Sequence, residues 1–144
     1  MASDLHEVAA QRLRAVGQRY TSGRRKVVDV LAQSGQPLTI PELLAAGDRV
    51  PQSSAYRNLA VLEQAGVVHR LVTSGDFARF ELAEDLTEHH HHLICAACGG
   101  VEDFIAPPSL ERSLHRAVTA VEDSTGFSAS LHRLDLIGTC RACA

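Results

Sequence analysis

Four cysteines constrain this chain more than any other feature of its sequence. Cys95 and Cys98 form one C-x-x-C pair, and Cys140 and Cys143 form a second pair near the C-terminus. In a cytosol that keeps thiols reduced, two such pairs are typical of a metal site rather than of disulfides. Four thiolates from two tight turns complete a tetrahedron around zinc and leave no position open for chemistry. The cysteines therefore predict a structural zinc site.

The charge of the chain is divided unevenly between its halves. The 144 residues are enough for one domain or two small ones. Residues 1–80 carry a net charge of +3 and residues 81–144 carry −6, which suits the front half to an anionic partner and the back half to cations. No apolar stretch approaches the roughly 20 residues that a bilayer needs, and no signal peptide is visible. We therefore expect a cytoplasmic protein with no membrane association.

Helical patterns fill the first half of the chain. Thr39 and Glu42 fit a capping box, with a proline in the first turn of the helix that follows. Two apolar runs, 67–72 and 77–82, are separated by Thr73-Ser74-Gly75-Asp76 and predict a hairpin. Helices followed by such a hairpin are typical of a winged helix. The helices themselves are predicted over residues 5–16, 22–34, 40–47 and 52–66.

The fourth predicted helix has the features of a DNA recognition helix. Ser53 or Ser54 is expected to cap it. Tyr56, Arg57 and Asn58 follow near its N-terminal end, where a recognition helix presents side chains to base edges in the major groove. From helix spacing alone, a packed aromatic and a solvated charge are the favoured interpretation, by roughly two to one.

The run His89-His90-His91-His92 predicts two metal sites rather than one. It is internal and leads into an apolar strand, whereas an expression tag is normally longer and terminal. In a strand, successive side chains point to opposite faces, so His89 and His91 share one face and His90 and His92 the other. Two imidazoles are an incomplete coordination shell, so each face should recruit further ligands.

The candidates for those further ligands lie in a helix predicted over residues 109–124 and a strand predicted over residues 130–138. The helix carries Glu111, His115 and Glu122, and the strand carries His132 and Asp135. For each residue taken singly, an ordinary surface position is the alternative, and spacing alone does not decide between the two.

Three segments of the sequence resemble the ferric uptake regulator family. Residues 54–66 are similar to its T-V-Y-R-x-L recognition-helix signature ending in A-G, with Ser54-Ala55 in place of Thr-Val. Residues 19–24 resemble its R-x-T-x-x-R segment. The pattern H-H-x-H-L-I-C-x-x-C, followed by a late H-x(7)-C-x-x-C, also belongs to this family. The resemblance covers the chain from Arg19 to Cys143.

This resemblance implies an α+β protein that binds double-stranded operator DNA as a homodimer. The implied domains are an N-terminal winged-helix DNA-binding domain over residues 1–83, a hinge over 84–88, and a C-terminal α/β dimerisation domain over 89–144, which also binds metal. Arg19 is expected to approach the minor groove. The residues expected to contact DNA are Arg19, Ser54, Tyr56 and Arg57.

The resemblance also divides the histidines between two sites. A site within the dimerisation domain is implied at His89, His91, Glu111 and His132. A sensing site between the domains is implied at His69, Glu81, His90 and His92. The resemblance does not fix how residues 83–88 align with the family pattern, so Asp85 is an alternative to Glu81.

The function implied is a metal-dependent, zinc-responsive transcriptional repressor that binds palindromic operators of metal-uptake genes. Zinc is expected at the structural and the sensing sites, because His69 occupies a position typical of zinc regulators. Iron is the alternative at the sensing site, since the chain lacks a fifth cysteine. A peroxide sensor ranks last, because an aspartate would be expected where Glu111 stands.

Two other classes of protein fit the sequence less well. A zinc hydrolase would need a paired acid and base or a nucleophile motif, and the sequence shows neither. A metal-storage or trafficking protein would leave the predicted recognition helix bearing Tyr56 and Arg57 without a function. We therefore do not expect an enzyme.

Overall fold

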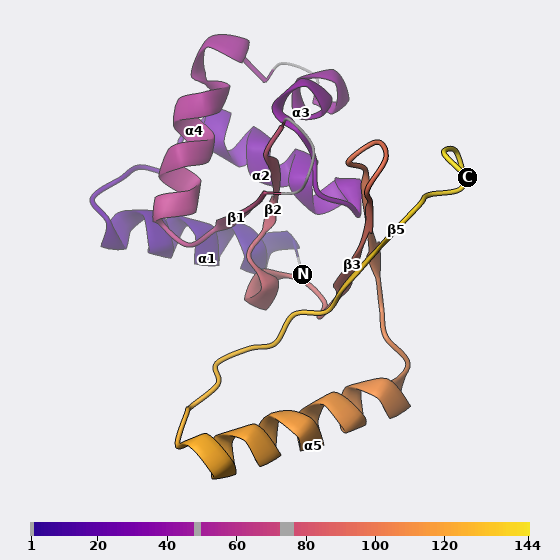
Figure 1. Cartoon of the computed structure of the whole chain (residues 1–144). Helices are drawn as coiled ribbons and strands as arrows, with labels where there is room; N and C mark the ends of the chain where they lie inside the picture. The colour runs from indigo at the N-terminus through magenta and orange to yellow at the C-terminus, as the bar shows by residue number, and fades with distance from the viewer. Residues whose placement is uncertain (1, 48–49, 73–76) are drawn as a thin grey trace.

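The computed structural model describes residues 2–47, 50–72 and 77–144, which form an α+β protein with two small sheets (Figure 1). The predicted fold class is confirmed. In chain order the elements are α1 (Ala2–Ala15), α2 (Ser22–Ser34), α3 (Ile40–Ala46), α4 (Gln52–Gln64), β1 (Val68–Leu71), β2 (Arg79–Leu82), the 3-10 helix η1 (Glu84–Leu86), β3 (His91–Cys95), β4 (Val101–Phe104), α5 (Pro108–Thr125) and β5 (Asp135–Gly138).

Side chains at their starts explain where two of the N-terminal helices begin. The Thr21 hydroxyl accepts a hydrogen bond from Arg24 N at 3.3 Å and caps α2, which ends at Gly35 with φ of 67°. Thr39 caps α3 in the same way by accepting from Glu42 N at 3.3 Å. The predicted capping-box threonine is therefore confirmed.

The predicted serine cap of α4 is wrong. The helix begins at Gln52, two residues earlier than a Ser53 cap would require, with Pro51 at the cap position and no side-chain cap hydrogen bond. Ser54 instead donates from its hydroxyl to the Pro51 carbonyl at 3.4 Å. The fixed φ of proline, here −67°, directs the chain into the helix without a capping side chain.

The four helices and the first hairpin share one hydrophobic core. Its fully buried members include Val27 and Val28 from α2 and Leu59 and Leu62 from α4. β1 and β2 pair antiparallel with His69 opposite Glu81, and they form the wing. The predicted turn at residues 73–76 lies outside the described residues. This arrangement is a winged-helix domain.

The second sheet has the strand order β4-β3-β5, with β3 in the centre. β3 pairs antiparallel with β4 and parallel with β5, which places His92 opposite Asp103 on one side and Asp135 on the other. β5 starts later than predicted, so His132 precedes it. β3 likewise begins at His91, and the first two histidines of the run lie just before the strand.

α5 lies away from the helices of the winged-helix domain and leads from β4 to β5 (Figure 1). The sequence of α5 is amphipathic, yet none of its residues is buried, and every residue of β5 is exposed. An apolar surface is therefore uncovered in the single chain. Within the described residues, no helix combines the length and the apolar character needed to cross a membrane.

We predict that Leu59→Ala will lower the free energy of unfolding by about 2–5 kcal/mol, because truncation of a buried leucine loses apolar contact and leaves a cavity. Leu59 is 1% exposed in the core. The measurement is denaturant unfolding of the zinc-loaded protein. Val72→Ala, at a position 77% exposed, is the control and should change this free energy by less than about 0.5 kcal/mol. Equal losses would contradict the assigned core.

Candidate metal centres and nucleic-acid interface

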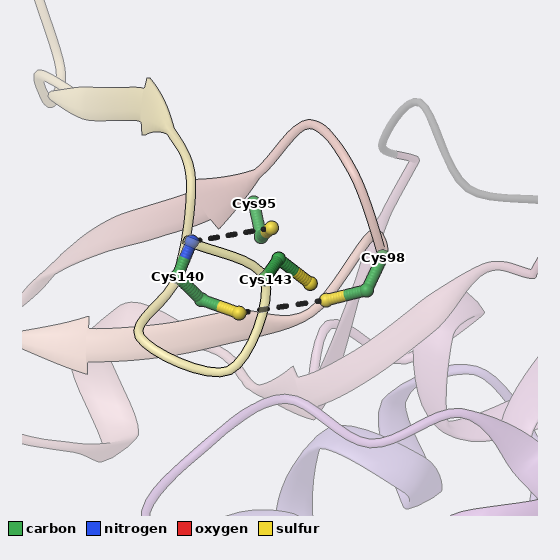
Figure 2. A group of neighbouring side chains, drawn as sticks. All are labelled: Cys95, Cys98, Cys140 and Cys143. Carbon is green, nitrogen blue, oxygen red and sulfur yellow. Dashed lines mark hydrogen bonds between the residues drawn. The ribbon is translucent and has the colours of Figure 1, made fainter.

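The four cysteines converge where β3 and β5 end (Figure 2). Parallel pairing places Cys95 opposite Gly138, so the turn after each strand carries its C-x-x-C pair to the same end of the sheet. All four sulfurs lie within 4.8 Å of one another, and the Cys98 and Cys140 sulfurs are 3.9 Å apart. This donor set is typical of structural zinc.

Backbone amides prepare this cysteine group for a cation. Cys140 N donates a hydrogen bond to the Cys95 sulfur at 3.3 Å. Together with the amides of the Cys98 turn, this contact lowers the pKa of Cys95 to about 6, which favours the thiolate that binds metal. Interaction with Cys140 and Cys98 raises the pKa of Cys143 to about 12. A full set of four thiolates therefore requires a positive charge among them.

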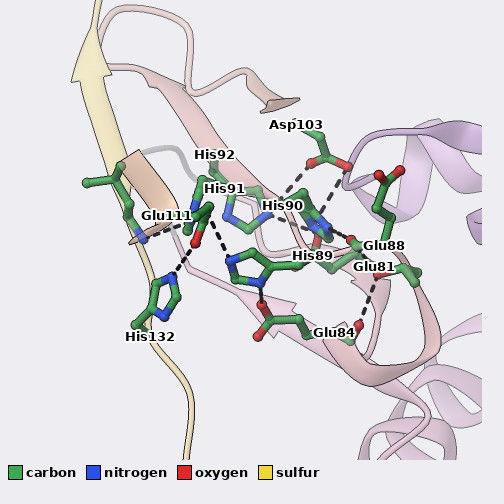
Figure 3. A network of polar contacts seen from close by, with 12 residues as sticks. Glu81, Glu84, Glu88, His89, His90, His91, His92, Asp103, Glu111 and His132 are labelled. Atoms are coloured by element: carbon green, nitrogen blue, oxygen red, sulfur yellow. Dashed lines mark hydrogen bonds and ion pairs between the residues drawn. The ribbon is translucent and has the colours of Figure 1, made fainter. Parts of the chain in front are cut away.

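The histidine run divides into two groups, as strand alternation predicts (Figure 3). In the first group, His89, His91 and His132 surround Glu111 of α5. The Glu111 carboxylate accepts from His91 Nε2 at 2.6 Å and from His132 Nε2 at 3.2 Å. The donor atoms of all four residues lie within 4.8 Å of one another. The structure thus brings together every residue expected at the dimer-domain site.

The second group joins the two sheets. Glu81 on β2 accepts hydrogen bonds at one carboxylate oxygen from His90 Nε2 at 3.0 Å and from His92 Nε2 at 3.1 Å. Asp103 on β4 completes the group, with its carboxylate 3.8 Å from His90 Nε2 and 3.6 Å from His92 Nε2. These four residues form the third set whose donor atoms lie within 4.8 Å of one another.

The structure does not place His69 or Asp85 in this second group. His69 is exposed on β1, opposite Glu81. It lines the same cavity as the histidine run, of about 780 Å³, without joining the ligand set. Asp85 forms an ion pair with Arg12 of α1. Glu81 is therefore the carboxylate beside His90 and His92.

Asp103 is the site residue that sequence reasoning missed. Gly99, with φ of 73°, lets the chain reverse after the first C-x-x-C pair. The chain then returns antiparallel along β3 and pairs Asp103 with His92. The signal in the sequence was the Cys98-Gly99-Gly100 turn between two short apolar runs. Treating that turn as a hairpin would have identified Asp103.

Each histidine group contains a buried polar atom that has a possible ion-pair neighbour but makes no hydrogen bond within the described residues. Among the described residues, the buried side-chain nitrogen and oxygen atoms without a hydrogen-bond partner are His89 Nε2 and Asp103 Oδ1. Such atoms are costly unless something binds them. The other ring nitrogen of His90 lies 2.9 Å from the Glu88 carbonyl, a contact that directs Nε2 towards a metal. Both donor sets fit a divalent metal such as zinc or iron.

The electrostatics of the second group favour the charged forms of Glu81, His90 and His92 but disfavour that of Asp103. Burial alone would raise the pKa of Glu81, but hydrogen bonds from His92 and His90 outweigh it and hold this pKa below its ordinary value. Burial likewise opposes the charged forms of His90 and His92, yet the pKa of His90 is raised by the Glu88 carbonyl and the nearby carboxylates, and that of His92 by the carboxylates. Burial raises the pKa of Asp103. A metal therefore competes with protons here, and acidification should weaken its binding.

The expected DNA contacts lie on the surface of the winged-helix domain. Tyr56 is 67% exposed, Arg57 and Arg19 are exposed, and Ser54 is half-buried. Asn58, which the sequence placed beside Tyr56 and Arg57 near the base edges, is instead buried.

Asn58 holds a buried arginine between α4 and the loop before α2. Its carboxamide oxygen accepts from Arg24 Nε at 3.2 Å. Arg24 also donates to the Arg19 carbonyl at 2.6 Å. This bridge fixes the backbone of Arg19 relative to α4.

Comparison with known proteins agrees with this architecture. Residues 15–137 match the profile of the ferric uptake regulator family. The ferric uptake regulation protein of Legionella pneumophila is 32% identical over 93% of this chain and 97% of that protein. The peroxide operon regulator of Bacillus subtilis is 30% identical over 100% of this chain and 97% of that protein. These relatives are regulators, and the hydrolase alternative finds no support among them.

Solved structures extend the similarity to the fold. The Helicobacter pylori ferric uptake regulator, described as having three functional metal binding sites, matches with a TM-score of 0.74 at 27% identity, over 99% of this chain and 93% of that one. A zinc-bound manganese uptake regulator matches with a TM-score of 0.65 at 30% identity, over 94% and 98%. The chain therefore belongs to the ferric uptake regulator family.

Proposed function

We propose that this chain is a zinc-responsive transcriptional repressor that binds palindromic operators of metal-uptake genes as a metal-loaded homodimer. The observation that carries the proposal is the position of Glu81. It belongs to the wing, whereas His90, His92 and Asp103 belong to the segment and sheet that follow the hinge. A ligand set shared between the DNA-binding and dimerisation domains links metal binding to their relative orientation.

The proposed switch follows from that shared ligand set. A bound divalent cation supplies the positive charge that lets Glu81 and Asp103 remain ionised side by side. Glu81 then holds the wing against His90 and His92 in one orientation. If this closed form binds the cation about 10²–10⁴-fold more tightly than an open form, occupancy of the operator changes with metal concentration. The proposed domain limits remain residues 1–83 and 89–144, with the hinge between them.

The other two sites have proposed supporting roles. The group of four cysteines holds the ends of β3 and β5 together as a structural zinc site. The Glu111 group connects α5 to the start of β3 and steadies the dimerisation domain. His69, beside the ligand set but outside it, is retained as a proposed additional sensing ligand, since it lines the same cavity.

The exposed apolar surface of the back half supports the proposed homodimer. Val121 of α5 is 53% exposed, and Leu136 and Ile137 of the edge strand β5 are 50% and 73% exposed. Large apolar side chains left exposed on both elements are suited to an interaction site, and a second copy can bury them symmetrically. Such a dimer would present two copies of α4 to sites about 34 Å apart on DNA.

Zinc is the proposed regulatory metal, and ferrous iron is the second candidate. Two imidazoles and two carboxylates provide the four ligands that zinc accepts in tetrahedral geometry. The second candidate has its own support, because the set contains no thiolate and the Legionella pneumophila relative is a ferric uptake regulation protein.

We expect the zinc-loaded protein to bind promoter DNA of metal-uptake genes at least about tenfold more tightly than the chelated protein, because closure favours the DNA-binding orientation. The measurement is fluorescence anisotropy at fixed salt, with zinc, ferrous iron or chelator. A larger gain in DNA affinity with ferrous iron than with zinc would identify iron as the regulatory metal. Equal affinity in all three conditions would contradict a metal-responsive repressor.

We expect Arg57→Ala to weaken specific operator binding by about 1–3 kcal/mol, because the exposed Arg57 side chain on α4 is proposed to contact bases or phosphates. Zinc content and dimer mass should stay unchanged, because Arg57 lies on the exposed face of α4. Loss of metal or of the dimer in this variant would assign Arg57 to the fold rather than to the DNA interface.

We expect His90→Ala to abolish the zinc-dependent gain in operator affinity while the dimer persists, because it removes one ligand from the shared set. Cys95→Ala should instead unfold or monomerise the back domain, because it removes a ligand of the structural site. Anisotropy and analytical ultracentrifugation distinguish these results. Identical behaviour of the two variants would contradict the proposed division of roles.

A further inference from the structure

A single arginine connects the winged-helix domain to the turn of the cysteine site. Arg79 is the first residue of β2, and its side chain is 13% exposed. Its Nε donates a hydrogen bond at 3.0 Å to the carbonyl of Gly99, the residue directly after Cys98. Its Nη1 donates to the two carboxylate oxygens of Glu42 at 3.0 and 3.3 Å. Neither contact involves a residue of the histidine groups.

The winged-helix end of this bridge is held rigidly. Phe80, the neighbour of Arg79, exchanges two backbone hydrogen bonds with Leu38, at 2.9 and 2.7 Å. This pairing places the strand beside the start of α3, and Arg79 Nη1 lies 3.5 Å from the Pro37 carbonyl. Glu42 lies in the first turn of α3, where Thr39 caps the helix. Arg79 is therefore fixed to the helix that precedes the recognition helix.

The opposite end of the bridge is held by the cysteine turn. Gly99 is buried, and its amide donates to the Cys95 carbonyl at 2.9 Å. Its φ of 73° is a consequence of the reversal between β3 and β4. The position of the Gly99 carbonyl therefore depends on the same turn that presents Cys95 and Cys98. Any change in that turn moves the acceptor of Arg79.

We propose that Arg79 is a positioning residue that couples the four-cysteine site to the orientation of the winged-helix domain. The cysteine site then does more than stabilise its own sheet, because it also fixes a connection between the domains. A second connection is the Glu81 ligand set, only two residues along β2. The two connections together define an orientation, whereas either one alone would leave a rotation about a single contact.

The chemistry of arginine is suited to this role and that of lysine is not. The planar guanidinium donates in different directions from Nε and Nη1, so it serves the carbonyl and the carboxylate together. A lysine retains the positive charge but has a single ammonium on a flexible chain. Arg79→Lys therefore separates the loss of the bridge from the loss of charge, and Arg79→Met removes both.

The test compares the zinc-loaded full-length wild type with the Arg79→Met and Arg79→Lys variants by small-angle X-ray scattering without DNA. Arg70→Met on β1 is the matched control, because Arg70 is exposed and its one ion pair among the described residues is with Glu63 at 4.0 Å. We expect both Arg79 variants to retain zinc and dimer mass but to show an increased radius of gyration, and the control to match the wild type. Scattering of Arg79→Lys identical to wild type would overturn the proposal.

A second measurement, operator affinity against salt concentration, rests on the proposed function. We expect both Arg79 variants to bind about tenfold more weakly, with the salt dependence unchanged. Full recovery by Arg79→Lys, with a shallower salt dependence in Arg79→Met, would assign Arg79 to a phosphate contact and overturn the proposal. If wild type shows no metal-dependent DNA binding, the proposed function fails, whereas the scattering result still decides the role of Arg79.

Discussion

The alternation of side chains along an extended backbone is the constraint on which this structure depends. Four consecutive histidines enter β3 with alternating directions, so His89 and His91 lie with Glu111, and His90 and His92 lie with Glu81. A helix would have spread the same four residues around its circumference. Because the backbone is extended, one short segment contributes to two chemically separate sites.

β3 also organises what surrounds these sites. It is the central strand of its sheet and pairs antiparallel with β4 and parallel with β5. Antiparallel pairing brings Asp103 back beside His92. Parallel pairing with β5 brings the second pair of cysteines to the end where β3 has its first pair (Figure 2). One strand thereby sets the ligands of all three candidate metal sites.

The wing carries the residues that meet this strand from the other domain. Arg79 and Glu81 both lie on β2, where one reaches the cysteine turn and the other reaches the histidine run. Both side chains are largely buried and charged, and each has partners of opposite charge or carbonyl oxygens. Buried charges that lose their partners are strongly destabilising, so these contacts favour a specific arrangement of the domains more than they add net stability.

Local pattern and resemblance were enough to predict much of this protein. The helix spacing, the Thr39 cap and the wing follow from local preferences, the α+β class follows from the resemblance, and the structure has all of them. The two faces of the histidine run also followed from sequence, because alternation is a property of the strand itself. The choice of Glu111 and His132 as partners came from the resemblance, and the structure places both beside His91.

Only the tertiary structure decided the contacts made between distant segments. Asp103 joins His90 and His92 through strand pairing, while His69, predicted from the resemblance, stays exposed on β1. Asp85, an alternative in the sequence, pairs with Arg12 instead. Arg79 lies in none of the sequence motifs, so its role could not be predicted. The physical reason is that strand register and chain reversal, rather than local spacing, determine which side chains meet across 20 or 37 residues of sequence.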